Sequence, residues 1–163
     1  LNEFYTEEDC CRAIRKHLED VLKTLPWVAT IDAFQHWIYT HPEHSRQDRT
    51  AFWLELGKRF GSVVDWDGLS AEQEAAWHRQ LHPFEVPFYY VEYGIAQLGA
   101  LQMWLRYCQD APSAISAYKA GLSLGGSKPL PQLFEAAGLS FDFNVDMVSE
   151  LIDAVEAALQ KYQ

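Results

Sequence analysis

Apolar side chains recur at intervals of three and four residues along most of the chain, which is the spacing of one face of an α-helix. The first stripe runs through residues 13–25, behind an acidic run that starts after Thr6. Thr6 is a suitable N-cap, because its hydroxyl can accept a hydrogen bond from a free N–H group of the first turn. Since proline fits the first turn of a helix, we expect a second helix to begin at Pro26.

The segment 27–39 is apolar on nearly every side, which is typical of a central helix. It contains His36, for which we expect a core position with Asp32, one turn earlier, as its hydrogen-bonding partner. Ser45 followed by Asp48 predicts a capping box at the start of the next helix, and Gly61 predicts its end.

Further helices are predicted by cap residues, glycines and prolines. They run from Ser70, capped with Gln73, toward Leu81; from Pro87 to about Tyr107; from Ser113 to Gly125–Gly126; from Pro131 to Ala137; and along the stripe Val148, Leu151, Ile152, Val155 and Leu159. Pro83 disfavours a helical conformation at His82. The stretch 62–69 is irregular, with a turn at Asp67-Gly68.

Alternating strand patterns longer than a few residues, internal repeats and a dividing linker are all missing from the sequence. The pattern therefore predicts an all-α fold, a single bundle of about seven helices that forms one domain over residues 1–163. A chain of this length can bury its own core.

Composition narrows the classes of protein and partner. A hydrophobic content of 48% excludes a disordered chain, and no apolar run reaches the ~20 residues of a membrane span. The formal net charge of −10 argues against nucleic acids and anionic membranes as partners. Three cysteines, two of them adjacent, fit a reducing compartment. With no signal or transit peptide at its start, we expect a cytoplasmic location.

Complete catalytic or metal-binding motifs are missing from the sequence. It has no HExxH motif, in which two histidines hold zinc and the glutamate activates water. His78 and His82 have the right spacing, but Arg79 stands where the glutamate would be. A metal site in the polar loop of His41 and His44 is improbable, and Cys10-Cys11 lacks CxxC spacing. We therefore predict no metal ligand in this chain.

The segment from His82 to Trp104 carries the most unusual chemistry. On a helix that starts near Pro87, the side chains of Tyr89, Tyr90 and Tyr93 are three and four residues apart, so their hydroxyls can converge. The small residues that follow, Gly94, Ala96, Gly99 and Ala100, would let another backbone pack closely. Taken alone, this period favours a core helix with an aromatic stripe.

The order of residues in this segment is more informative than its period. FEVPFYYVEYGIAQLGA, residues 84–100, resembles the C-terminal catalytic region of oligoendopeptidase F, in the thimet-oligopeptidase-like zinc metallopeptidases. The resemblance extends upstream through LPWVATIDAFQHWIYTHP, and downstream through the Gly-Gly-Ser-Lys-Pro segment and LFEAAGL. It covers most of the chain.

The resemblance implies a mechanism and a set of residues. In the family, zinc polarises the scissile carbonyl and a glutamate-activated water attacks it. A histidine and tyrosines of this region donate hydrogen bonds to the oxyanion that forms. The matching positions are His82, Tyr90 and Tyr93, with Tyr89 as a substrate contact.

The family's zinc-binding HExxH helix is not in this sequence. We therefore expect the chain to be a C-terminal portion of the catalytic domain. The parent protein would use Zn²⁺ to cleave short unstructured peptides, and the remaining N-terminal part would be this chain's partner.

The isolated chain is expected to be inactive, to bind no zinc tightly and to self-associate through an exposed apolar face. The alternative is a non-catalytic helical module that binds a partner chain or a small apolar ligand.

Overall fold

The computed structural model describes residues 3–61 and 63–162, and all regular secondary structure within them is helical. Ser62, the start of the stretch predicted to be irregular, lies outside the described residues. The elements are α1 (Glu7–Thr40), α2 (Arg46–Phe60), α3 (Ser70–Ala75), the 3-10 helix η1 (Ala76–Arg79), α4 (His82–Glu85), α5 (Val91–Gln109), α6 (Ala111–Ser123), α7 (Leu130–Ala136) and α8 (Val145–Lys161). The predicted all-α fold is confirmed. None of the described helices is both long and apolar enough to cross a membrane.

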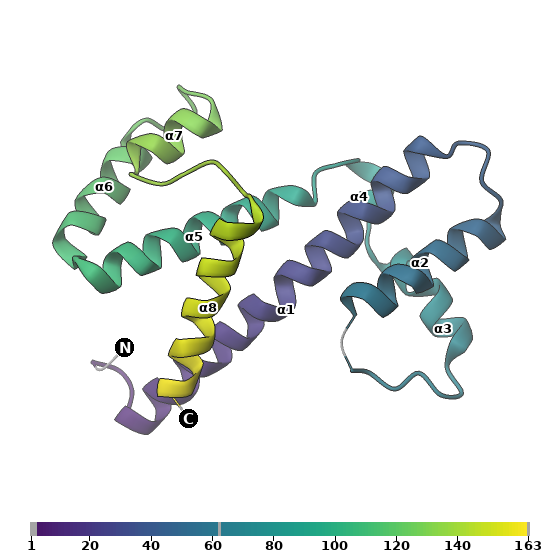
Figure 1. Cartoon of the computed structure of the whole chain (residues 1–163), viewed down its shortest axis with the longest axis horizontal. Helices are drawn as coiled ribbons and strands as arrows, with labels where there is room; N and C mark the ends of the chain where they lie inside the picture. Colours follow the sequence, from purple (N-terminus) through teal and green to yellow (C-terminus); the bar gives the residue numbers. More distant parts are fainter. Residues whose placement is uncertain (1–2, 62, 163) are drawn as a thin grey trace. The chain divides into compact units, whose positions relative to one another are not determined.

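Helix α1 corrects the prediction that a second helix begins at Pro26. It runs without interruption from Glu7 to Thr40 with Pro26 inside it, as Figure 1 shows. An interior proline costs about 3 kcal/mol. The next turns bury Val28, Ile31 and Phe34 almost completely, and each such side chain contributes about 1.5–3 kcal/mol. Burial therefore outweighs the cost of the proline. Thr6 caps the helix as predicted, since its hydroxyl accepts from the N–H of Asp9 at 3.2 Å.

The chain divides into two compact units, Val21–Gly94 and Leu1–Asp20 with Ile95–Gln163. Helices α1 and α5 each contribute residues to both units. The unit Val21–Gly94 contains α2, α3, η1 and α4, and the other contains α6, α7 and α8.

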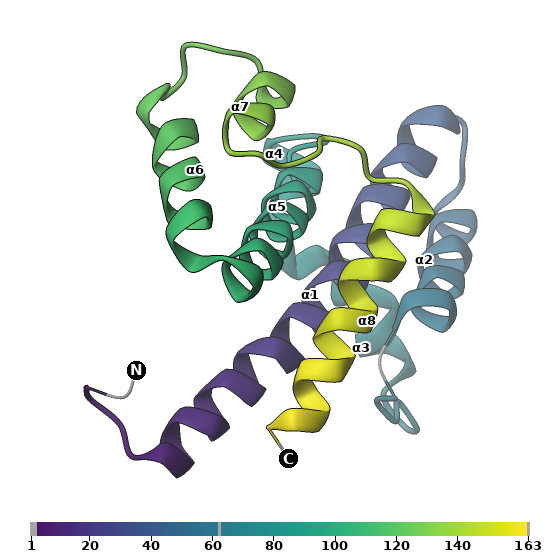
Figure 2. The same cartoon turned by 60° about the vertical axis from the view of Figure 1, so that its left-hand side comes forward.

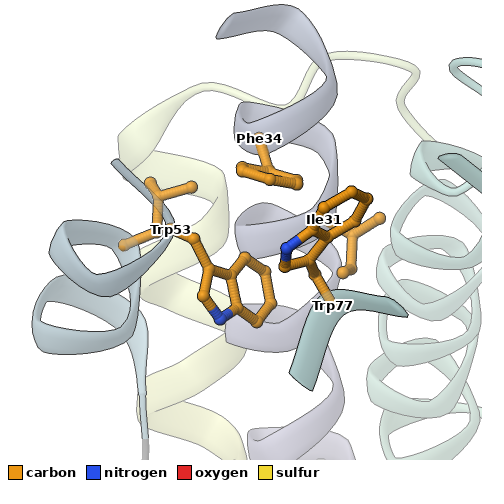
Figure 3. Close-up of a cluster of buried hydrophobic side chains, with 5 residues drawn as sticks. Ile31, Phe34, Trp53 and Trp77 are labelled. Atoms are coloured by element: carbon orange, nitrogen blue, oxygen red, sulfur yellow. The ribbon is translucent and has the colours of Figure 1, made fainter. Parts of the chain in front are cut away.

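The core of the unit Val21–Gly94 is aromatic. Ile31 and Phe34 of α1 are fully buried there and meet Trp53 of α2 and Trp77 of η1 (Figure 3). The ring of Phe34 lies 5.1 Å from that of Trp53 and 5.2 Å from that of Trp77, between centroids. Three elements are thus held together by one cluster.

Helix α2 begins and ends where the sequence predicts. Ser45 and Asp48 form the capping box, and the helix ends before Gly61. Helix α3 differs from the prediction. Its N-cap is Leu69 and it has no side-chain cap, so Ser70 is the first helical residue. The indole N–H of Trp53 donates to the carbonyl of Gln73 at 2.9 Å, and this bond joins α2 to α3.

In the second unit, α6 and α7 lie side by side (Figures 1 and 2). The N-cap of α6 is Asp110, whose carboxylate accepts from the N–H of Ser113. The sequence predicts Ser113 as the N-cap, but Ser113 lies inside the first turn and donates its N–H to the cap residue Asp110. The segment after α7 is tied to α5, because Gln102 exchanges two hydrogen bonds with the backbone of Ser140 and Arg106 donates to the carbonyl of Gly138.

The two glycines of α5 do not face another backbone, which corrects the prediction that these small residues let a backbone pack closely. A Cβ atom at Gly94 would lie 3.1 Å from the side chain of Val28, and one at Gly99 would lie 2.9 Å from the ring of Phe134. These glycines make room for side chains.

Candidate active site

The candidate site lies where α4 gives way to α5, within the unit Val21–Gly94. Pro83 sits in the first turn of α4, and His82 is the first residue of that helix. This corrects the prediction that Pro83 keeps His82 out of a helix. The bias against a helical conformation before proline is overcome here by bonds from the next turn, since the N–H of Val86 reaches the carbonyl of His82.

The start of α5 also differs from the prediction. The helix begins at Val91, not near Pro87. Phe88 has a positive φ of 63°, a left-handed conformation that no helix can continue. The chain reverses at this residue, and the N–H groups of Glu92 and Tyr93 then bond to the carbonyls of Tyr89 and Tyr90. The reversal brings these tyrosines back toward His82.

Four side chains that the sequence singled out are brought together by this arrangement. The imidazole of His82 lies 4.8 Å from the ring of Tyr90, 5.7 Å from Tyr93 and 6.1 Å from Tyr89, between centroids. The rings of Tyr90 and Tyr93 are 5.1 Å apart and those of Tyr89 and Tyr93 are 5.9 Å apart. We refer to His82, Tyr89, Tyr90 and Tyr93 as the His–Tyr cluster.

Two of the cluster's polar groups are in direct contact. Nε2 of His82 lies 3.3 Å from the hydroxyl of Tyr93. Nδ1 of His82 is buried and has no hydrogen-bond partner among the described residues. The side chains of Tyr89 and Tyr93 are about half exposed, at 50% and 45%. The phenol groups of Tyr89 and Tyr93 therefore reach solvent, while the imidazole of His82 beside them is partly buried.

Trp27 is a member of the site that the sequence did not reveal. Its indole Nε1 lies 3.0 Å from the hydroxyl oxygen of Tyr90. Trp27 and Arg79 also line a cavity of about 840 Å³ between α1 and α2, together with Trp53, Phe60 and Trp66. No sequence spacing connects α1 to Tyr90, so no local signal could have identified Trp27.

Phe88 is a second residue that shapes the site and that the sequence did not indicate. Its ring packs against His36 and Tyr39 of α1, with 4.9 Å and 5.1 Å between centroids. A left-handed phenylalanine gives no sequence signal, because glycine and asparagine are the residues that normally mark this conformation.

The other histidines lie outside the cluster. Asp32, the expected partner of His36, lies near it, but the 3.6 Å between its carboxylate and Nε2 is too long for a hydrogen bond, and the side chain of His36 is 63% exposed and not in the core. An imidazole on the surface keeps its hydration, which explains this location on an otherwise apolar helix. His78 belongs to η1 and packs on Trp77, whereas His82 belongs to α4, so the two do not share one helix face.

Over residues 3–61 and 63–162, no three His, Cys, Asp or Glu side chains lie together in a way that could hold a metal ion. His41 and His44 instead contact Trp37, and each directs Nδ1 to a backbone carbonyl.

Comparisons with known proteins agree on one group. The family model of peptidase family M3 matches residues 3–151. A crystal structure of a Bacillus anthracis (strain Ames) protein, assigned as an oligoendopeptidase F, resembles the chain with a TM-score of 0.74 and 29% identity. The match covers 98% of this chain and 25% of that one, so the chain spans about a quarter of its structural relative. The curated proteins include no significant match.

Proposed function

Since the chain belongs to peptidase family M3, we propose that it is a C-terminal portion of a peptidase catalytic domain and supplies the wall that binds the scissile peptide. The complete protein would be a zinc-dependent oligoendopeptidase that cleaves short unstructured peptides. The contact between His82 and Tyr93 is the observation that carries this proposal, because it joins an imidazole to a phenol at a partly exposed surface.

The described side chains do not fit a zinc ion, since they contain no group of three ligands. Residues outside this chain would bind the ion, which would act there as a Lewis acid. What this chain contributes is hydrogen bonding and orientation. Hydrolysis of an amide places negative charge on the carbonyl oxygen, and donors fixed in advance near that oxygen lower the barrier.

The proposed donor is the hydroxyl of Tyr93, and its availability depends on the tautomer of His82. If Nε2 carries a proton, it donates to the oxygen of Tyr93 and leaves the phenol proton for the substrate. If Nε2 is bare, it accepts that proton instead. The productive form is therefore the one with a proton on Nε2. Tyr90 would be a second donor, and the exposed ring of Tyr89 would contact the peptide.

The three cysteines are free, which supports a reducing compartment such as the cytoplasm for the proposed enzyme.

The experiment uses the complete protein that carries this chain and a set of short internally quenched peptides. We expect zinc-dependent cleavage. Tyr93→Phe, which removes one oxyanion donor, should lower kcat about a hundredfold with little change in KM. Tyr107→Phe is the matched control, because Tyr107 lies on the same helix and is 52% exposed. An unchanged kcat in Tyr93→Phe would remove Tyr93 from the mechanism. A complete protein that cleaves none of the peptides would favour the non-catalytic alternative.

A further inference from the structure

The hydrogen bond between Trp27 and Tyr90 joins residues that are 63 positions apart in the sequence. An indole N–H can only donate, so the oxygen of Tyr90 must be the acceptor. The separation is 3.0 Å, within the ordinary range for such a bond. In this contact the hydroxyl oxygen of Tyr90 therefore acts as an acceptor.

The other side of that hydroxyl is left free to donate. A phenol has one proton, and the proton cannot point toward an indole N–H that already points at the oxygen. Within the described part of the chain, the bond from Trp27 is the one hydrogen bond that the Tyr90 hydroxyl makes. Its proton is consequently directed away from Trp27. The ring of Tyr90 lies against His82 and Tyr93.

Trp27 is itself held firmly. The guanidinium of Arg79 lies over its ring at 5.1 Å from the centroid, and Trp53 meets it edge to face at 6.0 Å. Trp53 is anchored in turn by its bond to Gln73. Contacts with a cation on the face and a ring at the edge both restrict how an indole can rotate. The N–H of Trp27 is thus a fixed donor.

We propose that Trp27 is a positioning residue of the His–Tyr cluster, whose indole N–H holds the Tyr90 hydroxyl so that the phenol proton is presented to the peptide carbonyl. This inference rests on the proposed function. It assigns no chemical step to Trp27, which acts through Tyr90 alone.

The test is a double-mutant cycle in the complete protein. Trp27→Phe keeps an aromatic ring and removes the N–H. We expect kcat to fall about three- to tenfold with KM unchanged, as for the loss of one hydrogen bond. In a Tyr90→Phe background the hydroxyl is already missing, so Trp27→Phe should cause no further fall. An equal fall in both backgrounds, or none in either, would overturn the inference.

Trp37→Phe is the control, since it also removes an indole N–H from α1 but from a ring that packs on His41, His44 and Phe52, not on Trp27. Its effect on kcat should be the same with and without the Tyr90 hydroxyl. Melting temperatures of all variants separate lost stability from lost orientation.

A second measurement needs no catalysis. In the complete protein labelled with ¹⁵N-tryptophan, the indole resonance that disappears in Trp27→Phe belongs to Trp27. Tyr90→Phe should shift that resonance and speed its exchange with solvent, whereas Tyr107→Phe should leave it unchanged. A Trp27 signal that ignores Tyr90→Phe overturns the inference even in an active peptidase. If the Trp27 resonance responds to Tyr90→Phe in a protein without peptidase activity, the contact between Trp27 and Tyr90 is supported and only the proposed function is rejected.

Discussion

The ring of Phe88 lies against the imidazole of His36, with 4.9 Å between their centroids, while the backbone of Phe88 holds a φ of +63°. A left-handed phenylalanine is costly, by roughly 1–2 kcal/mol. Such a residue persists only when its surroundings hold it in place. Here the contacts with His36 and Tyr39 do so, and the reversal they enforce returns Tyr89, Tyr90 and Tyr93 to His82.

Two substitutions at Phe88 separate its backbone from its ring. Phe88→Ala and Phe88→Gly both lose the contacts with α1, but only alanine keeps the left-handed strain. Relief of that strain exceeds the entropy that glycine adds to the unfolded chain, so Phe88→Gly should be more stable by roughly 0.5–1 kcal/mol. Calorimetric melting of the complete protein would reveal the order.

Val86 provides the comparison, because its φ is −139°. There the alanine variant should melt above the glycine variant. If alanine also proved the more stable residue at position 88, the left-handed backbone would carry no strain.

Substitutions of His82 test which of its nitrogens matters. Glutamine places its amide nitrogen near the position of Nε2, and asparagine places its amide near Nδ1. Since Nε2 is the atom that contacts Tyr93, His82→Gln should keep more of the kcat than His82→Asn, which should fall about a hundredfold like the loss of an oxyanion donor. The measurement is kcat on a short peptide. The opposite order would assign the essential contact to Nδ1.

The capping box of α2 predicts a dependence of stability on acid. Hydrogen bonds from the Ser45 hydroxyl and backbone lower the pKa of Asp48 below the usual 3.8. Because the folded pKa is the lower one, the carboxylate stabilises the fold fully above its ordinary pKa, and this contribution is lost as the pH falls through the folded value.

Asp48→Asn should therefore lower the melting temperature at pH 6, and its deficit relative to the unmodified protein should shrink as the pH falls below about 4. Glu55→Gln is the matched control, because Glu55 is an exposed carboxylate of the same helix. A deficit in Asp48→Asn that stays constant down to pH 2 would contradict the role of its charge.

Two helical glycines should respond to alanine in opposite directions. A Cβ atom at Gly57 would meet nothing within 4 Å, whereas one at Gly121 would lie 2.8 Å from the Cβ of Ala137 and 3.3 Å from its backbone. Gly57→Ala should stabilise α2 by up to about 1 kcal/mol through helix propensity. Gly121→Ala should destabilise the protein, because overpacking costs about 1–3 kcal/mol and exceeds that gain. Melting temperatures that rise in both variants would show that α6 and α7 can separate slightly.

The sequence predicted those features that depend on a few neighbouring residues. The bonds of Thr6 and of Ser45 with Asp48 were foreseeable because each cap lies three residues from its partner. The proximity of Tyr89, Tyr90 and Tyr93 was expected from helical spacing, but Tyr89 and Tyr90 precede the helix, which begins at Val91, and the turn at Phe88 brings their rings together.

Features that depend on contacts between residues far apart in the sequence could not be predicted from it. Pro26 signals a helix start, but the burial of Ile31 and Phe34 by α2 and η1 keeps the helix intact through it. His36 lies among apolar residues in sequence, yet it faces outward and supports Phe88. The hydrogen bond from Trp27 to Tyr90 depends on the folded chain alone.

The proline inside α1 has a consequence for how that helix opens. Proline has no amide proton, so the carbonyl of Leu22 lacks its usual donor at this point of the ladder. The boundary between the two compact units crosses the same helix at Asp20 and Val21. Transient unfolding of either unit can therefore stop at this gap. Deuterium uptake in the part of α1 before Val21 should follow the fluctuations of one unit, and uptake after Pro26 those of the other, so that a geometrically continuous helix behaves as two kinetic segments.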